Sequence, residues 1–215
     1  MKSFDRGEEF VDRLDEGDLG GVAQGIGFAM DVYFASHFGH TERIALTLAT
    51  LISQAGVPAR ARNIGLDFPS ESEIRSPEPC VLISPIRYGG HLAAPRRLLK
   101  RLAPLTPQKP LALLSVSLSA RKEGRRSAAD NLYLRKWIAR SGARPALAEA
   151  IAGKLEYPRY NPFDRTMIRL IMTITGGPSD GTSVIDYTSW PRVAELATEI
   201  GRLAKPYTTA AQPLD

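Results

Sequence analysis

Residues 32–41 read VYFASHFGHT: an apolar run ends at a serine, the chain turns at a glycine, and a helix begins at a threonine. Such a turn leaves unpaired backbone amides at the helix N-terminus, where the helix dipole favours a bound anion. Because the Walker lysine is missing, the loop suits a phosphate monoester held without Mg²⁺, as FMN requires, better than a nucleoside triphosphate. An ordinary capped helix without a ligand is the alternative. The residues of this loop assigned to the cofactor are Ser36, His37, Phe38, Gly39, His40 and Thr41.

Around this stretch, segments of strand character alternate with segments of helical character. The predicted strands are 29–35, 59–63, 80–84, 111–116 and 146–153. The predicted helices are 41–55, 95–102, 129–141 and 190–203. This alternation favours an α/β fold with a doubly wound parallel sheet of five strands in the order 2-1-3-4-5. Residues 119–131 and 155–188 exceed this design, as an insertion after strand 4 and an extra helical segment after strand 5.

Two further loops follow the third and fourth predicted strands. In an open α/β sheet the ligand lies beyond the carboxyl ends of the strands, so we expect all three loops to meet in one crevice. Tyr88 stands beside glycines and can lie against the isoalloxazine ring of FMN, while an aromatic packed on its own loop is the alternative. The further residues assigned to the cofactor are Pro85, Ile86, Arg87, Tyr88, Gly89, Ser117, Leu118, Ser119 and Ala120.

Longer motifs surround these loops. They are FASHFGHTERIA (34–45), IRYGGH (86–91), SVSLSARK (115–122), YPRYNPFDRTMIRLIM (157–172) and TGGPSD (175–180). Together they resemble the flavodoxin-like, menaquinone-dependent protoporphyrinogen IX dehydrogenases of bacteria over about residues 30–203. The resemblance implies a flavodoxin-like fold, bound FMN, and oxidation of protoporphyrinogen IX to protoporphyrin IX in haem biosynthesis. It also implies electron transfer to menaquinone or ubiquinone, by a protein peripherally associated with the cytoplasmic face of the inner membrane.

Composition and length fit a globular domain: the chain has 215 residues, of which 43% are hydrophobic and 24% charged. We expect residues 1–28 to form an acidic, flexible extension, 29–205 the FMN-binding domain, and 206–215 a tail. No apolar run is long enough to span a membrane, and the acidic start has no signal-peptide core, so we expect a cytoplasmic protein. The single cysteine, Cys80, excludes an internal disulfide and opens a buried strand, where we expect it to be inert.

The net charge of +5 is unevenly distributed. Residues 1–28 carry a net charge of −4, whereas residues 119–144 hold eight Lys and Arg against two acids. Guanidinium groups match carboxylates, so this insertion can bind the propionates of the substrate that the resemblance implies. Anionic lipid, or a solvated surface without a ligand, is the alternative. The residues assigned to the substrate are Arg121, Lys122, Arg125 and Arg126.

Residues 162–174, PFDRTMIRLIMTI, predict a helix whose apolar residues are flanked by Arg165 and Arg169. This pattern fits a helix lying on an anionic membrane surface, and also a helix packed on the sheet. The three histidines, His37, His40 and His91, all fall in or beside the predicted flavin loops, where we expect them at the flavin edge or in solvent. Since no carboxylate has matching spacing, we predict no metal site.

Two other functions suit the same fold: a flavodoxin-type electron carrier and an NAD(P)H:quinone reductase. The basic body and the two extra segments argue against the carrier. A nucleic-acid-binding module is disfavoured because the basic residues do not alternate with exposed aromatics. The redox chemistry is assigned to the flavin, and no catalytic side chain is named. The sequence leaves a homo-oligomer open.

Overall fold

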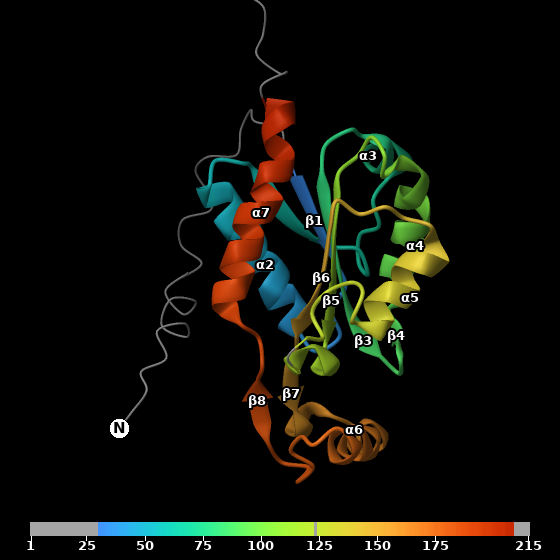
Figure 1. Cartoon of the computed structure of the whole chain (residues 1–215), viewed down its shortest axis with the longest axis vertical. Coiled ribbons are helices and arrows are strands. Elements are labelled where there is room, and N and C mark those ends of the chain that lie inside the picture. Colours follow the sequence, from blue (N-terminus) through green and yellow to red (C-terminus); the bar gives the residue numbers. More distant parts are fainter. Residues whose placement is uncertain (1–29, 123, 209–215) are drawn as a thin grey trace, which may run out of the picture.

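The strands predicted from the sequence form one parallel sheet in the computed structural model of the protein, which describes residues 30–122 and 124–208 (Figure 1). The sheet order is β2-β1-β3-β5-β6, which confirms the predicted fold class and the order 2-1-3-4-5. The five strands are β1 (Met30–Phe34), β2 (Ala59–Asn63), β3 (Cys80–Arg87), β5 (Leu111–Ser117) and β6 (Leu147–Ala152). The predicted extension, residues 1–28, and most of the predicted tail lie outside the described residues.

Helices cover both faces of this sheet (Figure 1). One face carries α2 (His40–Gln54) and α7 (Trp190–Thr208), and the other carries α3 (Glu71–Arg75), α4 (Ala93–Leu102), the 3-10 turn η1 (Ala103–Leu105) and α5 (Leu132–Ser141). Successive strand residues point to opposite faces, so each strand feeds two cores. Val32 and Phe34 pack in the core that contains Leu48 of α2, whereas Tyr33 packs in the core that contains Leu98 of α4.

Capping side chains set where two of these helices begin. The predicted start of α5, residue 129, is three residues early because the Asn131 side chain caps the helix, accepting a bond of 3.1 Å from the backbone N–H of Leu134. The same helix ends at Ser141, and Gly142 caps it with a left-handed backbone. The short helix α3 was not predicted, and it starts with a capping box between Ser70 and Glu73.

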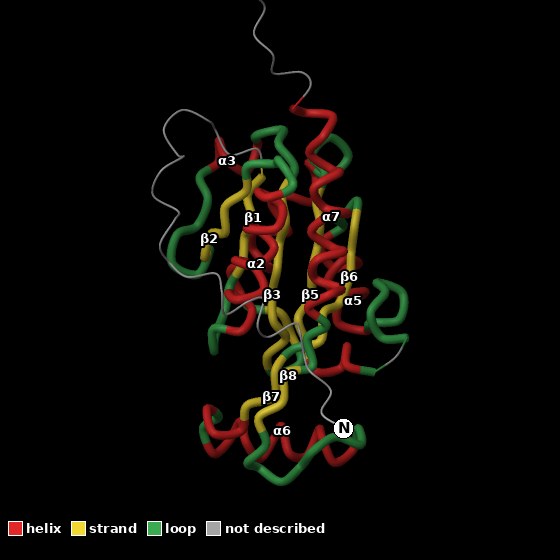
Figure 2. The backbone as a smooth tube through the Cα atoms, turned by 90° about the vertical axis from the view of Figure 1, so that its left-hand side faces the viewer, coloured by secondary structure: helices red, strands yellow, loops and turns green. Residues whose placement is uncertain are grey.

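Residues 154–188, which we call the added segment, form a small unit beyond the carboxyl edge of the sheet (Figure 2). Its elements are β7 (Lys154–Glu156), the 3-10 turn η3 (Tyr157–Arg159), α6 (Pro162–Ile174) and β8 (Val184–Asp186). The strands β7 and β8 pair antiparallel, and Leu155, Tyr157 and Met172 form a separate buried cluster under α6. The helix over 162–174 confirms the prediction, while the two strands, each of three residues, were missed.

Candidate functional site

The first loop joins β1 to α2 and leaves the helix start open to a ligand. Gly39 is the N-cap residue and has φ +86°, and no side chain caps the helix. The Gly39 N–H donates to the Ser36 hydroxyl oxygen at 3.0 Å, which closes the turn. Residues 35–41 contain no carboxylate, and Thr41 adds a hydroxyl at the start of the helix. Open amides and two hydroxyls without an acid are the donors that a phosphate monoester needs, so this loop fits the phosphate of FMN.

The two histidines of this loop differ in their surroundings. His37 is largely exposed, and its pKa is lowered by partial loss of solvent around the ring and by the positive charge of Arg87. The His40 ring turns toward the added segment, where its Nε2 lies 2.8 Å from the Thr188 hydroxyl and 3.7 Å from Asp186. Burial lowers the pKa of His40 although Asp186 opposes the shift. The ring of His40 therefore serves the contact between α2 and β8, and its backbone amide remains at the helix start.

The second loop is a hairpin, because β3 runs three residues beyond its predicted end before the chain turns back into β4 (Gly90–His91). Tyr88 and Gly89 form the turn with φ of +49° and +74°. Among the described residues, Tyr88 is the one residue other than glycine that has a positive φ, and it is 58% exposed. Positive φ at both turn positions matches the right-handed twist of a two-residue hairpin.

The hairpin corrects the expectation for His91. The sequence placed this residue at the flavin edge or in solvent, but β4 turns its ring into the core, where it stacks on Trp137 at 3.8 Å between ring centroids. The Ser115 hydroxyl lies 2.9 Å from His91 Nε2. Burial lowers the pKa of His91 to about 3, so this histidine is neutral and belongs to the packing between the sheet and α5.

The third loop follows β5 as the 3-10 turn η2 (Leu118–Arg121). The hydroxyl oxygens of Ser117 and Ser119 lie 2.9 Å apart, and Ala120 is fully buried. Arg121 donates to the Leu118 carbonyl at 2.9 Å, and to the Thr175 hydroxyl at 2.8 Å. Its guanidinium thus ties the third loop to the C-terminal end of α6.

Sequence reasoning missed Asp164, which lies in the first turn of α6 and is 6% exposed. Its carboxylate accepts from Arg87 Nη2 at 2.8 Å and from the Tyr88 hydroxyl at 2.7 Å. Asn161 donates to the same carboxylate at 3.0 Å and caps the helix by accepting from the Asp164 N–H at 2.8 Å. The run Asn-Pro-x-Asp is a recognisable helix start, but nothing in it indicates that the carboxylate meets the hairpin.

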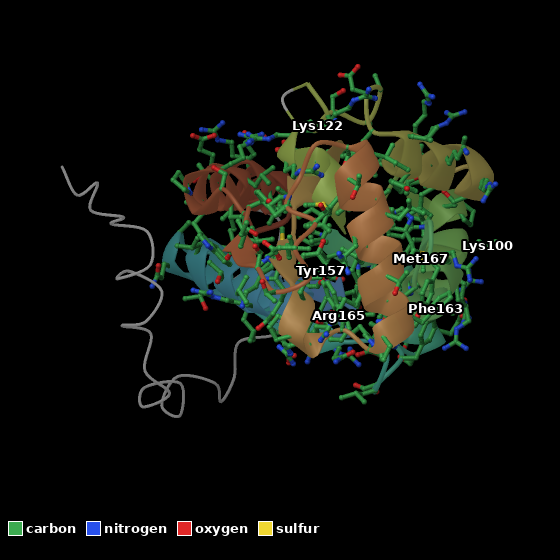
Figure 3. All side chains as sticks on the ribbon, turned by 90° about the horizontal axis from the view of Figure 1, so that it is seen from below. Lys100, Lys122, Tyr157, Phe163, Arg165 and Met167 are labelled. Carbon is green, nitrogen blue, oxygen red and sulfur yellow. The ribbon has the colours of Figure 1, made fainter. Side chains whose placement is uncertain are left out.

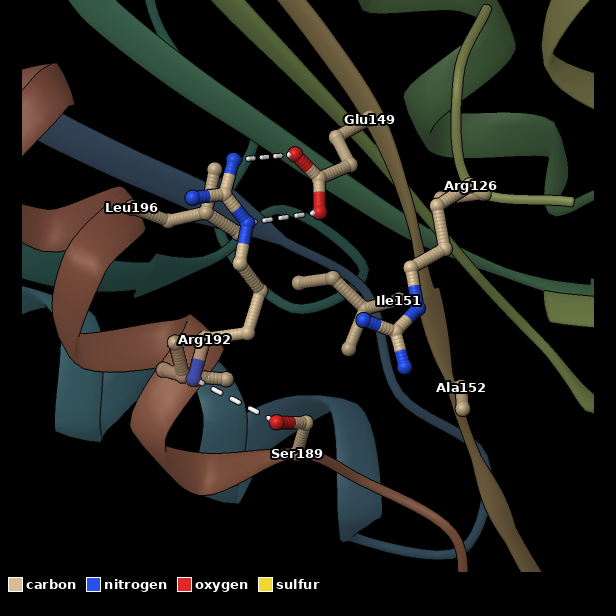
Figure 4. Close-up of a pocket in the computed structure, with 9 residues that line it drawn as sticks. Arg126, Glu149, Ile151, Ala152, Ser189, Arg192 and Leu196 are labelled. Carbon is tan, nitrogen blue, oxygen red and sulfur yellow. Dashed lines mark hydrogen bonds and ion pairs between the residues drawn. The ribbon is translucent and has the colours of Figure 1, made fainter. Parts of the chain in front are cut away.

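The four cations assigned to the substrate differ in their surroundings. Lys122 is exposed beside Arg121, whereas Arg125 donates to the carbonyl of Asp130 at 3.3 Å. Arg126 lines a small pocket between β6 and α7 (Figure 4). There Arg192 donates to the two oxygens of Glu149 at 3.0 and 2.7 Å. The lining of this pocket contains no residue of the three loops.

The three predicted loops leave the sheet at the carboxyl ends of neighbouring strands. Pro85 pairs with Val116 in the register of β3 and β5, so the second and third loops leave neighbouring strands. Phe38 of the first loop lies 5.3 Å from the Arg87 guanidinium of the second, measured to the ring centroid. The three loops therefore share the carboxyl edge of the sheet.

Cys80 is buried, and burial raises the pKa of its thiol to about 12, as expected for an inert cysteine.

Comparisons with known proteins identify a matching family and similar proteins. A family model described as a flavodoxin domain matches residues 32–182. The Escherichia coli (strain K12) protein named protoporphyrinogen IX dehydrogenase (quinone) is 36% identical over 172 residues, which cover 80% of this chain and 94% of that protein. The Leishmania major protein of the same name is 35% identical over 165 residues, covering 77% of this chain and 71% of that protein.

Among solved structures, a flavodoxin from the domain Archaea aligns with a TM-score of 0.48 and 14% identity, covering 82% of this chain and 98% of that one.

Proposed function

The chain belongs to the flavodoxin domain family, within the group that contains the protoporphyrinogen IX dehydrogenases (quinone), and from this premise we propose its reaction. The protein binds FMN and oxidises protoporphyrinogen IX to protoporphyrin IX, passing the electrons to a quinone. The observation that carries the proposal is the 36% identity to a relative of this name over 94% of that relative's length.

The three loops give each part of the cofactor a place. The open amides of α2 with Ser36 and Thr41 would hold the phosphate, and the hairpin at Tyr88 with the turn after Ser117 would hold the isoalloxazine ring. Bound FMN supplies the two-electron redox chemistry. The chain supplies position: the buried Asp164 fixes Arg87 and Tyr88, and Arg121 fixes the third loop against α6.

The substrate carboxylates fit best at Lys122, the exposed cation that directly follows the third loop. Two guanidinium nitrogens of Arg121 donate hydrogen bonds, one to Leu118 and one to Thr175. Arg121 therefore orients the loop, while its positive charge remains beside Lys122. A charged hydrogen bond of this kind contributes about 1.5–3 kcal/mol when desolvated and less in an open site. Arg125 and Arg126 are exposed farther along the same insertion, and Arg126 lines the pocket between β6 and α7.

A peripheral contact with the membrane fits the face of α6 that points away from the sheet. Phe163, Leu170 and Ile174 are 68%, 60% and 75% exposed, and they recur at helical spacing on one side of the helix. In Figure 3, which looks onto this end of the molecule, Phe163 and Met167 lie on one side of α6 and Arg165 on the other. No helix of the described residues is long and apolar enough to cross a membrane.

This contact would bring the protein to the cytoplasmic face of the inner membrane, where menaquinone or ubiquinone is dissolved. Apolar side chains that enter the interface next to cations bind anionic lipid by two additive effects, and each cation near the surface contributes about 1 kcal/mol. Sedimentation with vesicles containing anionic lipid measures this. Leu170→Asp should weaken binding at least about tenfold, whereas Leu46→Asp, at an exposed leucine of α2, should not.

The test of the reaction is reduction of the bound flavin under anaerobic conditions. The purified holoprotein should show a flavin absorbance spectrum, and protoporphyrinogen IX should bleach it in a stopped-flow experiment. A quinone should then restore the spectrum. Bleaching by NADPH but not by protoporphyrinogen would identify a quinone reductase, and bleaching by neither would leave an electron carrier.

A further inference from the structure

The added segment holds each of the three FMN loops by a hydrogen bond. Arg159 of η3 donates to the carbonyl oxygen of Phe38 in the first loop at 2.8 Å. Asp164 of α6 accepts from the second loop, and Thr175 after α6 accepts from Arg121 of the third. These bonds join residues that are far apart in the sequence, so they form only when the segment is docked on the edge of the sheet.

Asp164 is the centre of this docking. A carboxylate that is 6% exposed is costly to bury unless it is paired, and here its partners outside α6 and its cap are both in the hairpin: Arg87 at 2.8 Å and Tyr88 at 2.7 Å. Separation of α6 from the hairpin leaves the carboxylate without these donors. The guanidinium also lies 4.8 Å from the Tyr88 ring centroid and 5.3 Å from that of Phe38, so one side chain joins two loops.

The backbone of Tyr88 points to the same coupling. Its φ of +49° is a left-handed conformation that residues with a Cβ adopt only at an energetic cost. The bond from its hydroxyl to Asp164 offsets that cost, because it holds the ring over α6, where the Phe163 ring lies 6.2 Å away between centroids. The shape of the hairpin and the position of α6 therefore depend on each other.

We infer that Asp164 is a positioning residue that couples FMN binding to the docking of α6, so that a filled flavin site favours the fixed orientation in which the exposed apolar face of α6 is presented. The inference rests on the proposed function for the identity of the ligand. With the flavin site filled, the hairpin would keep the shape that offers Arg87 and Tyr88 to Asp164, and the docked helix would in turn hold the hairpin in that shape. Such coupling is reciprocal: each event strengthens the other by the same factor.

Hydrogen exchange followed by mass spectrometry, with and without FMN, tests the coupling on the full chain. In the unmodified protein, FMN should slow exchange of the peptide spanning 162–174 by about tenfold or more, the factor expected from one charged hydrogen bond. In Asp164→Asn the slowing by FMN should fall below about threefold, and FMN affinity should drop by a similar factor. Thr166→Ala, on an exposed side of the same helix, should behave as the unmodified protein.

A merely structural role for Asp164 would raise exchange equally with and without FMN, and that result overturns the inference. Unchanged protection of α6 in Asp164→Asn despite weaker FMN binding also overturns it, because Asp164 would then serve the hairpin alone. If Asp164→Asn fails to fold, Tyr88→Phe removes one of the two bonds and should give an intermediate loss of the FMN effect. Absence of FMN binding by the unmodified protein would refute the proposed function, which is a distinct outcome.

Discussion

Removal of the two hydroxyls at the first loop should release FMN while leaving the fold intact. The substitutions are Ser36→Ala with Thr41→Val. In the structure, the Ser36 oxygen accepts the Gly39 N–H, so its own hydroxyl hydrogen is free to donate to a phosphate. Thr41 lies at the open start of α2, where no side chain caps the helix. We therefore expect both hydroxyls to act on the ligand, and because Thr41 is buried, valine, which has nearly the same shape, keeps its packing.

A hydrogen bond to a charged group contributes about 1.5–3 kcal/mol, so each substitution should weaken binding by a factor of about 10 to 140. If the two effects add, the dissociation constant rises by about 10² to 10⁴. Loss of the Ser36 bond to Gly39 also loosens the turn, which places the expected value toward the upper part of this range.

Quenching of FMN fluorescence during titration of the apoprotein gives the dissociation constant directly. Thr47→Val is the matched control, since Thr47 is a buried threonine of the same helix two turns from its start. Circular dichroism of the apo forms checks that the helix content is unchanged. An unaltered dissociation constant in the double variant, with the control also unaltered, would refute the assignment of this loop to the phosphate.

Three further outcomes are expected. Burial holds the pKa of His91 near 3, below the 6.5 of an exposed histidine, so between these pH values the unfolded chain takes up a proton that the folded chain does not. The free energy of unfolding, measured in urea, should therefore fall by up to about 1.4 kcal/mol per pH unit as the pH drops from 6.5 toward 3. His91→Gln should show a smaller slope. Lys122→Ala should lower kcat/KM for protoporphyrinogen about 10-fold with FMN content unchanged, and an equal loss in Arg126→Ala would show a diffuse charge effect instead. A Cβ at Gly177 would overlap the ends of the Met172 and Arg121 side chains; because Met172 is fully buried, Gly177→Ala should lower the melting temperature, and an unchanged melt would show that these flexible ends move aside.

The sequence by itself determined the sheet and the first loop. Apolar residues such as Val32 and Leu82 stand in short continuous apolar runs, which indicate buried strands. Apolar residues such as Ile44 and Leu48 recur every three or four positions, which indicates a helix. These are local patterns, so they are readable without the fold. The turn at Gly39 was readable for the same reason, because a strand end, a glycine and a helix start are contiguous in the chain.

The length of β3 and the place of His91 were not readable. The strand continues past Ser84 because Pro85 pairs with Val116 of β5, and a proline ordinarily argues against a central strand. That extension turns β4 back onto α5 and buries the His91 ring against Trp137. Sequence proximity to the flavin loop suggested the opposite location, because it carries no information on which side of a hairpin a residue faces.

Only the tertiary structure decided the contacts that bind the added segment to the site. Tyr88 and Asp164 are 76 positions apart and His40 and Thr188 are 148 apart, yet each pair is joined at hydrogen-bond distance. No local pattern encodes such a pair. The bonds exist because the parallel sheet gathers the ends of β1, β3 and β5 at one edge, and because burial of a carboxylate there is favourable only when a distant arginine and tyrosine meet it.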